Sequence, residues 1–123
     1  MIILDTNVLI NILKDNQLTI EKIQSFNSPL AISSITVMEL LYGASNRAEM
    51  KKLEKFFTLF EVIEINEEIS KQSTTLIKTY AKSHKLSISN SLIASTALTL
   101  DAPIFTCELK DFQFINGLIF QLA

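Results

Sequence analysis

The fold is decided by the N-terminal stretch Ile2-Ile3-Leu4-Asp5-Thr6-Asn7-Val8-Leu9-Ile10. Its three leading apolar residues are typical of a short buried strand, which ends at Asp5. From residue 6 to residue 13 the apolar side chains fall at the spacing of one helix face, so this segment predicts a helix. A buried strand that leads at once into an amphipathic helix indicates an α/β domain.

The alternation of short apolar runs and amphipathic segments continues towards the C-terminus. Further strands are expected at residues 30–32, 62–65, 103–106 and 118–122, and further helices at about 20–26, 33–42, 46–60, 66–80 and 89–100, with a polar break at 82–87. This order predicts a three-layer α/β/α sandwich with a central, mainly parallel sheet. With 123 residues, the chain is expected to form a single domain over residues 1–123.

Polar residues mark where two of the expected helices begin and end. Ser33 or Ser34 is suited to cap the helix that follows the second strand, and Gly43 is suited to end it. Asn46 with Glu49 forms a capping-box pattern at the start of the next helix.

The composition excludes several kinds of catalytic site. One histidine and one cysteine cannot build a His/Cys zinc site within the chain. The two glycines lie 74 positions apart, which excludes a glycine-rich phosphate-binding loop. A serine–histidine–aspartate arrangement would need His84, which lies in a polar stretch and is better interpreted as a lone surface residue. What remains for catalysis is carboxylates, which bind hard divalent metals.

Charge and cysteine content limit the partners and the compartment. A net charge of −2 argues against nucleic-acid binding through a broad basic surface, so any such contact must be local or use a bound cation. The single cysteine, Cys107, cannot form a disulfide within the chain, which favours a reducing compartment. Neither a signal peptide nor a membrane-spanning run is evident, so we expect a cytoplasmic protein without membrane contact.

The expected topology places four acidic side chains at one edge of the sheet. Asp5 ends the first strand, Glu39 lies on the helix after the second, and Glu108 and Asp111 follow the fourth. Ligands of open α/β sheets gather at the carboxyl ends of the strands. Carboxylates at one spot repel one another, and a divalent cation is the simplest source of compensating charge. Such a metal could activate water for phosphodiester hydrolysis, although these grounds do not select a nuclease over another phosphoryl hydrolase.

Each of these acids also has a purely structural interpretation. Asp5 could simply cap the helix that follows it. Thr36 with Glu39 matches a capping box, unless that helix starts earlier. Glu108 and Asp111 could be solvated acids of a turn.

Four segments, in order along nearly the whole chain, resemble the sequence motifs of PIN domains. The first is the opening stretch, in which Asp5 matches the first metal-binding acid. The second is residues 32–40, in which Glu39 matches the second acid. The third is residues 86–94, and the fourth is residues 104–112, which contain a Thr, then an acid, and then an Asp-Phe pair.

This resemblance implies a Mg²⁺- or Mn²⁺-dependent endoribonuclease of the VapC type, the toxin of VapBC toxin–antitoxin modules. The catalytic and metal-binding residues that it implies are Asp5, Glu39, Asn90, Glu108 and Asp111. It also implies a structured RNA substrate such as tRNA or ribosomal RNA, a homodimer, and a VapB-type antitoxin whose C-terminal segment lies along the toxin and blocks its site. DNA contact is expected only indirectly, through that antitoxin.

One position departs from the family pattern, because the third motif supplies an Asp where this chain has Asn90. An amide oxygen can bind a metal but brings no charge, and a unit charge pair at about 4 Å is worth about 4 kcal/mol at an effective dielectric of 20. Glu108 or Asp111 could compensate. Three interpretations are open: a rearranged active site, a natural variant of low activity, or a deliberate Asp-to-Asn change that makes a toxic protein tolerable. The lost charge favours a site weakened at this position.

Four polar residues adjoin the acids by motif position, namely Thr6, Asn7, Ser33 and Thr106. They could orient metal ligands or hold a phosphate, although Ser33 could equally cap a helix.

Two other functions are compatible with this sequence. A degenerate PIN domain that only binds RNA or a protein would account for Asn90. The segment Leu4-Asp5-Thr6-Asn7 weakly resembles the first motif of haloacid-dehalogenase-like phosphatases. That chemistry needs a second Asp where Asn7 stands, and usually a longer chain.

Overall fold

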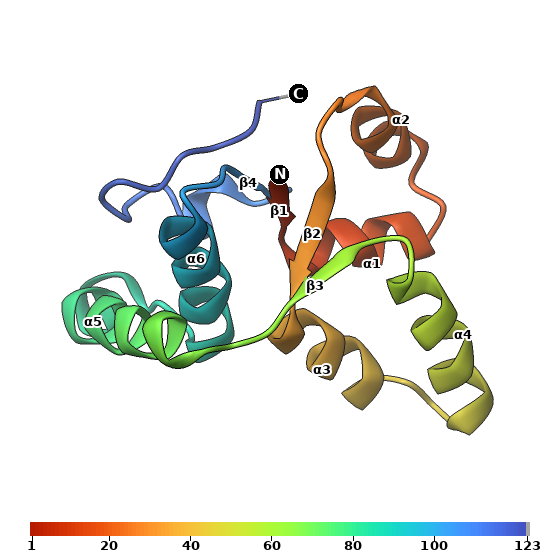
Figure 1. Cartoon of the computed structure of the whole chain (residues 1–123), viewed down its shortest axis with the longest axis horizontal. Coiled ribbons are helices and arrows are strands. Elements are labelled where there is room, and N and C mark those ends of the chain that lie inside the picture. The colour runs from red at the N-terminus through yellow and green to blue at the C-terminus, as the bar shows by residue number, and fades with distance from the viewer. Residues whose placement is uncertain (123) are drawn as a thin grey trace.

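The computed structural model describes residues 1–122 and has a four-stranded parallel sheet at its centre (Figure 1). The strands are β1 (Ile2–Leu4), β2 (Leu30–Ser33), β3 (Glu61–Ile63) and β4 (Ile104–Phe105), in the spatial order β3-β2-β1-β4. The helices are α1 (Thr6–Leu13), α2 (Gln17–Ser25), α3 (Ser34–Tyr42), α4 (Arg47–Phe57), α5 (Glu67–His84) and α6 (Ile88–Leu100), and a 3-10 turn η1 (Leu109–Asp111) follows β4.

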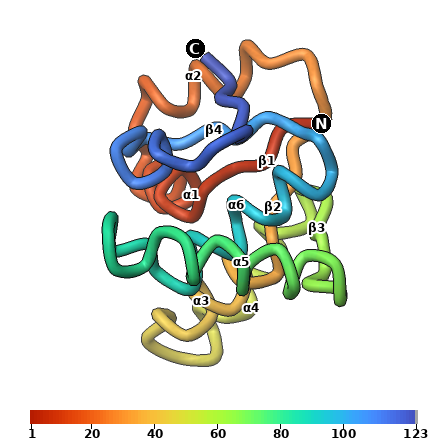
Figure 2. Tube along the Cα trace, turned by 90° about the vertical axis from the view of Figure 1, so that its left-hand side faces the viewer, coloured from red at the N-terminus to blue at the C-terminus, as the bar shows by residue number. Residues whose placement is uncertain are grey.

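Helices cover both faces of the sheet. Figure 1 shows α5 and α6 on one side of the strands and α1, α2 and α4 on the other, while α3 continues from the carboxyl end of β2. In Figure 2 both chain termini lie at one end of the molecule, and α3 and α4 lie at the opposite end. The expected three-layer α/β/α architecture with a parallel sheet is therefore confirmed. Within residues 1–122 no helix combines the length and the apolar character needed to cross a bilayer.

Neighbouring residues of β1, β2 and β4 pack into separate cores, because strand side chains point alternately to opposite faces. Ile3 and Ile104 belong to the core under α5 and α6. Ile2, Leu4 and Phe105 belong to the core under α1 and α4. A strand covered on both faces must be apolar throughout, which is why the opening run of the chain has no alternation.

The strand order creates a topological switch point between β1 and β4. The chain moves outward from β1 to β2 and β3, and then returns to place β4 on the other side of β1. Because all four strands are parallel, their carboxyl ends open at the same edge, where ligands of α/β proteins bind. Asp5 follows β1 and Thr106 follows β4, so two of the candidate residues meet at this point.

The expected fifth strand at residues 118–122 is wrong. This segment forms one isolated parallel bridge, between Phe120 and Ile104. Ile104 N–H donates to the Ile119 carbonyl at 2.9 Å, and the Ile104 carbonyl accepts from Gln121 N–H at 2.8 Å. This single bridge with its two hydrogen bonds is the only strand-like pairing of the segment within residues 1–122, so it does not become a fifth strand.

Two elements begin or end earlier than expected. β3 ends at Ile63 and not at residue 65 as expected, because the chain leaves the sheet where Ile65 N–H donates to Ser34 Oγ at 3.3 Å. α2 starts before the expected residue 20, because Asn16 caps its first turn.

The boundary between α5 and α6 also differs from the expected one. α5 continues to His84, into the expected polar break, and basic residues suit its last turn electrostatically. His84 itself is exposed, as expected of a lone surface histidine. α6 begins at Ile88 rather than at residue 89 or 90, because Ser87 caps it by accepting from Asn90 N–H at 3.1 Å.

The caps expected for α3 and α4 are confirmed. Ser33 caps α3 through its hydroxyl, which excludes the alternative capping box of Thr36 with Glu39. Asn46 caps α4 by accepting from Glu49 N–H at 2.9 Å.

Ser95 is buried in α6, and its hydroxyl has no hydrogen-bond partner within residues 1–122. Ser95→Ala removes an unsatisfied polar group and introduces a better helix former, so we expect the free energy of unfolding to rise by about 1 kcal/mol. Ser91→Ala is the matched control, since Ser91 bonds to Ser73 and to the Ile88 carbonyl, and we expect a loss of about 1 kcal/mol there. Urea denaturation measures both changes, and an equal loss in the two variants would contradict this account.

Candidate functional site

Asp5 lies at the switch point with both carboxylate oxygens engaged. Its Oδ1 accepts from Thr6 N–H at 2.8 Å, which caps α1. Its Oδ2 accepts from the Thr106 hydroxyl at 2.8 Å, which ties the end of β1 to the end of β4. Only 4% of Asp5 is exposed. The capping interpretation is confirmed, and it leaves a ligand role open because a carboxylate has further lone pairs.

The surroundings of Asp5 disfavour its charged form. Its pKa is raised from 3.8 to about 6, chiefly by burial; hydrogen bonds from Thr106 and Thr6 lower it in part, and the charges of Asp111 and Glu39 add to the rise. No basic side chain within residues 1–122 enters this balance. A buried carboxylate with acidic neighbours and no basic partner is typical of a site that is completed by a cation.

Glu39 extends from α3 towards the N-terminus of α1. Its Oε1 accepts from the Thr6 hydroxyl at 2.9 Å, and that hydroxyl lies 2.8 Å from Thr36 Oγ1. Thr36 is fully buried and one turn before Glu39 on the same helix. Thr6 therefore links two acids, because its N–H binds Asp5 and its hydroxyl binds Glu39.

Residues 106–111 carry the two remaining acids. Asp111 ends η1 and is exposed, yet its charge acts on the pKa of Asp5. Glu108 does not enter that balance; its carboxylate lies 3.9 Å from Lys110 Nζ, and its N–H donates to Thr106 Oγ1 at 3.0 Å. Of Glu108 and Asp111, only Asp111 therefore interacts electrostatically with Asp5.

One face of α1 holds the segment that carries these acids. Asn7 Oδ1 accepts from Cys107 N–H at 3.3 Å. One turn later, Asn11 Nδ2 donates to Cys107 Sγ at 3.2 Å. Together with the bond between Thr106 and Asp5, these contacts fix the chain after β4 along α1.

Asn90 lies in the first turn of α6 and is half-buried. Its backbone N–H is used by Ser87, whereas its side-chain amide makes no hydrogen bond within residues 1–122. The next residue, Ser91, is buried and bonds to Ser73 of α5. The amide of Asn90 is therefore available to a ligand, and its part in a metal site stays a prediction.

The donor set fits Mg²⁺ or Mn²⁺ chemically, although it is not closed around an ion. Within residues 1–122 no three acidic, histidine or cysteine side chains lie close enough together to form a ready metal-binding group. Asp5, Glu39 and Asp111 supply only oxygen ligands, which a hard divalent cation prefers. Their mutual repulsion is what a cation would relieve. Since Glu39 and Asp111 are exposed, they can rotate towards Asp5 at little packing cost.

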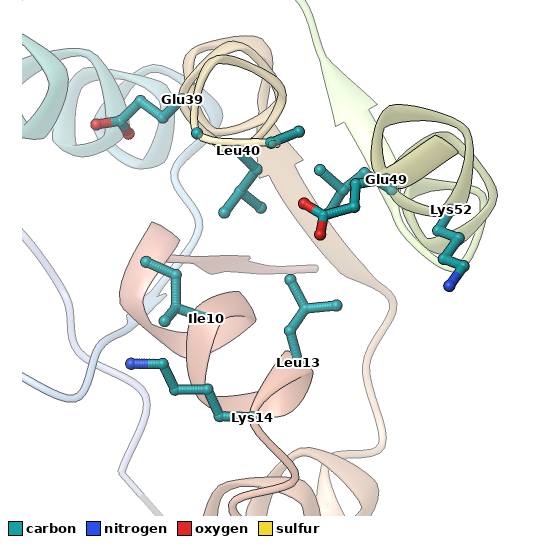
Figure 3. A pocket seen from close by; sticks show the side chains of 10 residues that line it. Ile10, Leu13, Lys14, Glu39, Leu40, Glu49 and Lys52 are labelled. Atoms are coloured by element: carbon teal, nitrogen blue, oxygen red, sulfur yellow. The ribbon is translucent and has the colours of Figure 1, made fainter. Parts of the chain in front are cut away.

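A groove of about 790 Å³ adjoins Glu39 between α1, α3 and α4 (Figure 3). Figure 3 shows Leu13 and Leu40 extending into the space between α1 and α3, with the Glu39 carboxylate on one side and Glu49 and Lys52 on the other. The lining is mainly aliphatic. A peptide segment with apolar side chains could thus lie beside the candidate acids.

Two residues of this site were missed by sequence reasoning. The sequence motifs indicate Thr36 only as half of a capping box and do not indicate Asn11. Each follows from helix periodicity: Thr36 lies three residues before Glu39, and Asn11 lies four residues after Asn7, so each pair shares one helix face.

Thr106→Val is expected to lower the free energy of unfolding by about 1–3 kcal/mol at pH 8. Valine keeps the shape but removes the hydroxyl that donates to Asp5 and accepts from Glu108 N–H. The loss should be smaller at pH 4, where Asp5 is protonated and needs the donor less. Urea titrations at the two pH values test this, with Thr106→Ser as the control that restores the hydroxyl; a pH-independent loss would be evidence against it.

Comparison with known families matches residues 2–114 to the family described as PIN domain. Among curated proteins, the "Ribonuclease VapC2" of Rickettsia felis is 32% identical over 127 aligned residues, which cover 96% of this chain and 94% of that relative.

Solved structures give the same likeness. A "Toxin-antitoxin complex from Klebsiella pneumoniae" has a chain that superposes with a TM-score of 0.82 at 27% identity, covering 97% of this chain and 96% of that one. VapBC2 from Rickettsia felis, bound to a DNA fragment from the promoter, has a chain with a TM-score of 0.80 at 27% identity, covering 98% of both chains.

Proposed function

Because the chain belongs to the PIN-domain family, and within it to the VapC group, we propose that it is a metal-dependent endoribonuclease, the toxin of a type II toxin–antitoxin module. The observation that carries the chemical part of this proposal is the buried carboxylate of Asp5 at the switch point. The negative charges of Glu39 and Asp111 raise the pKa of this carboxylate, and it has no basic partner in residues 1–122. The proposed substrate is structured RNA such as tRNA or ribosomal RNA, and the relative from Rickettsia felis is named a ribonuclease.

The proposed metal ligands are oxygen donors on the loops and helices that follow β1, β2 and β4, together with the first turn of α6. They are Asp5, Glu39, Asn90, Glu108 and Asp111. When bound, Mg²⁺ or Mn²⁺ supplies a water of lowered pKa and positive charge beside the phosphodiester.

The remaining residues act by positioning. Thr106 and Thr6 hold Asp5 in one orientation, so that its unused lone pairs point to the site at no reorganisation cost. Thr6 also holds Glu39, and the buried Thr36 hydroxyl bonds to the Thr6 hydroxyl. Asn7 keeps the Thr106–Asp111 segment against α1.

We propose that the aliphatic groove beside Glu39 receives the C-terminal segment of a VapB-type antitoxin. The groove is large enough for a chain of bulky apolar side chains, and its end at Glu39 would let that segment cover the acids. The solved neighbours described as toxin–antitoxin and VapBC assemblies support a partner of this class. Contact with DNA is proposed only through that partner.

A homodimer is also proposed. Tyr42, which is 93% exposed, and Met38, which is 51% exposed, lie one turn apart on α3 and form an uncovered apolar edge. Tyr42→Ser is expected to shift the sedimentation coefficient from that of a dimer to that of a monomer. A dimer that survives this change would place the interface elsewhere.

A catalytically degenerate module that binds RNA or protein is the second candidate, and Asn90 is the observation that favours it. The amide has no charge to contribute where the family supplies an acid. RNA binding that is unaffected by metal and by Asp5→Ala would be expected of such a module.

The direct test is incubation of the purified chain with tRNA and ribosomal RNA in Mg²⁺, in Mn²⁺ and in EDTA. We expect discrete new RNA ends with either metal and none with EDTA. Absence of cleavage by both the wild-type chain and Asn90→Asp would overturn the nuclease proposal. Release of phosphate from a small phosphoester, without RNA cleavage, would indicate a phosphatase instead.

A further inference from the structure

We propose that a second pocket, which shares Thr106 with the candidate site, is a subsite for one nucleotide of the RNA substrate; this rests on the proposed function. The pocket has a volume of about 370 Å³ and lies between α1, α2 and the segment 105–109. It is named here the α1–α2 pocket. It is separate from the groove between α1, α3 and α4, with which it shares no lining residue.

The walls of the α1–α2 pocket suit the faces of a nucleobase. Leu18 of α2 is 70% exposed and Leu109 of η1 is 48% exposed, so two large apolar side chains from different elements line the opening uncovered. Phe105 is buried at the inner side. Aliphatic and aromatic side chains hold an unstacked base by covering its faces.

The polar groups of the pocket suit a base edge and a phosphate. Asn11 Nδ2 donates hydrogen bonds to Cys107 Sγ at 3.2 Å and to Thr19 Oγ1 at 3.4 Å. Its Oδ1 accepts no hydrogen bond within residues 1–122. An amide held in this way presents a fixed acceptor, and asparagine amides read base edges in nucleic-acid complexes. Lys22 lines the pocket and forms no ion pair with residues 1–122, so it can meet a phosphate.

The charge of the pocket complements that of the neighbouring acids. Its lining includes one lysine and no acidic residue, whereas Asp5 is under the influence of the negative charges of Glu39 and Asp111. The groove on the other side has Glu39 and Glu49 in its lining as well as lysines. Of the two hollows, the α1–α2 pocket is therefore the one that a polyanion can enter without meeting a carboxylate.

One side chain joins the pocket to the proposed reaction centre. Thr106 lines the pocket and donates to Asp5 Oδ2 at 2.8 Å. Asn7 and Asn11 hold Cys107 from the same face of α1, so the shared wall is fixed by three contacts. A nucleotide in the pocket would thus place its neighbour in the chain beside Asp5, which makes Asn11, Leu18 and Lys22 specificity-determining residues.

The test compares two double variants of equal chemistry in an Asp5→Asn chain, in which turnover is removed. Leu18→Ser/Lys22→Gln alters the pocket, and Leu59→Ser/Lys51→Gln makes the same changes at exposed positions away from it. Binding of a fluorescein-labelled single-stranded 12-nucleotide RNA of random sequence is measured by anisotropy. We expect the dissociation constant to rise about tenfold for the pocket variant and less than about twofold for the control. Equal losses in the two would overturn the subsite, because they would show general electrostatic binding only.

A second measurement locates the nucleotide. Addition of UMP, CMP, AMP and GMP, each at millimolar concentration, to ¹⁵N-labelled protein is expected to shift the amide signals of Asn11, Leu18, Lys22 and Cys107. Ribose 5-phosphate, which lacks a base, should shift only the signals near Lys22. Nucleotide-induced shifts confined to residues outside the pocket would overturn the proposal.

Failure of the subsite and failure of the nuclease are distinguishable. RNA cleavage by the chain with an unchanged KM in Leu18→Ser/Lys22→Gln would refute the subsite while the nuclease stands. RNA binding that depends on the pocket, in a chain that cleaves no RNA, would support the subsite and refute the nuclease.

Discussion

An Asp5→Asn chain is expected to lose metal-dependent RNA cleavage by at least about a hundredfold and yet to be more stable than the wild type at pH 8. The loss follows because the variant lacks the buried charge on which the proposed metal site depends. The gain follows because the same charge, without metal, is held away from water and close to two other acids.

The pH dependence of this gain has a defined sign. The folded-state pKa of Asp5, about 6, lies above its ordinary value of 3.8. Its protonation therefore stabilises the fold, and this contribution is complete below pH 3.8 and is lost as the pH rises through about 6. At pH 8 the wild type has lost this whole contribution to its free energy of unfolding, which is roughly 3 kcal/mol. The variant has an uncharged amide at this position, so its stability has no such loss.

Thermal and urea unfolding between pH 4 and pH 8, with and without Mg²⁺, measure this prediction. The stability advantage of Asp5→Asn should appear only above about pH 5, and Mg²⁺ should stabilise the wild type but not the variant. Asp101→Asn is the control: Asp101 is exposed, it ends α6 with φ +53°, and asparagine accepts that conformation. An Asp5→Asn chain that is less stable than the wild type at pH 8, or that still cleaves RNA at the wild-type rate, would contradict the account.

Asn90→Asp is expected to increase RNA cleavage at subsaturating Mg²⁺ by about 10- to 100-fold. A full charge pair at about 4 Å is worth about 4 kcal/mol at an effective dielectric of 20, and screening by solvent at this half-buried position leaves a fraction of it. The change also suits the local backbone, because residue 90 lies in the first turn of α6, where the helix dipole favours a negative charge.

Calorimetric titration of the wild type and of Asn90→Asp with Mn²⁺ separates a metal effect from other causes. We expect the variant to bind Mn²⁺ more tightly by a factor similar to its gain in cleavage. Asn66→Asp is the matched control, since it adds the same charge at the N-cap of α5, where Asp is also a good cap. A gain in both variants would indicate a general charge effect, and no gain in Asn90→Asp would remove residue 90 from the proposed metal site.

The layers of the fold were predictable because the inner strands β1 and β2 are short, apolar and covered on both faces. Ile2–Leu4 illustrates this: every residue of the run is buried, so the sequence has no polar interruption to obscure the strand. The C-terminal segment shows the opposite case, because residues 118–122 are as apolar as a strand but pair with β4 only through the bridge between Phe120 and Ile104. Ile119 and Leu122 are exposed, so apolar composition alone determines neither burial nor backbone pairing in this segment.

The candidate site was predictable as far as topology determines it. Asp5 and Thr106 follow neighbouring parallel strands, and they form a hydrogen bond. The positions of Glu39 and Asp111 relative to Asp5 depend on helix rotation and on the turn after β4. In the structure Glu39 is joined to Asp5 through Thr6, and Asp111 acts on Asp5 only through its charge. The contacts made by Asn11 and Thr36 depend on side-chain orientation, which helix spacing suggests but does not determine.

The most direct test of the central claim is a crystal structure of the chain grown with Mn²⁺, with anomalous diffraction recorded at the manganese edge. We expect an anomalous peak bonded to an Asp5 oxygen, with Glu39 and Asp111 rotated towards it. Well-ordered crystals in which Asp5 binds no ion, while Glu39 stays bonded to Thr6 and Asp111 stays exposed, would contradict the proposed metal site.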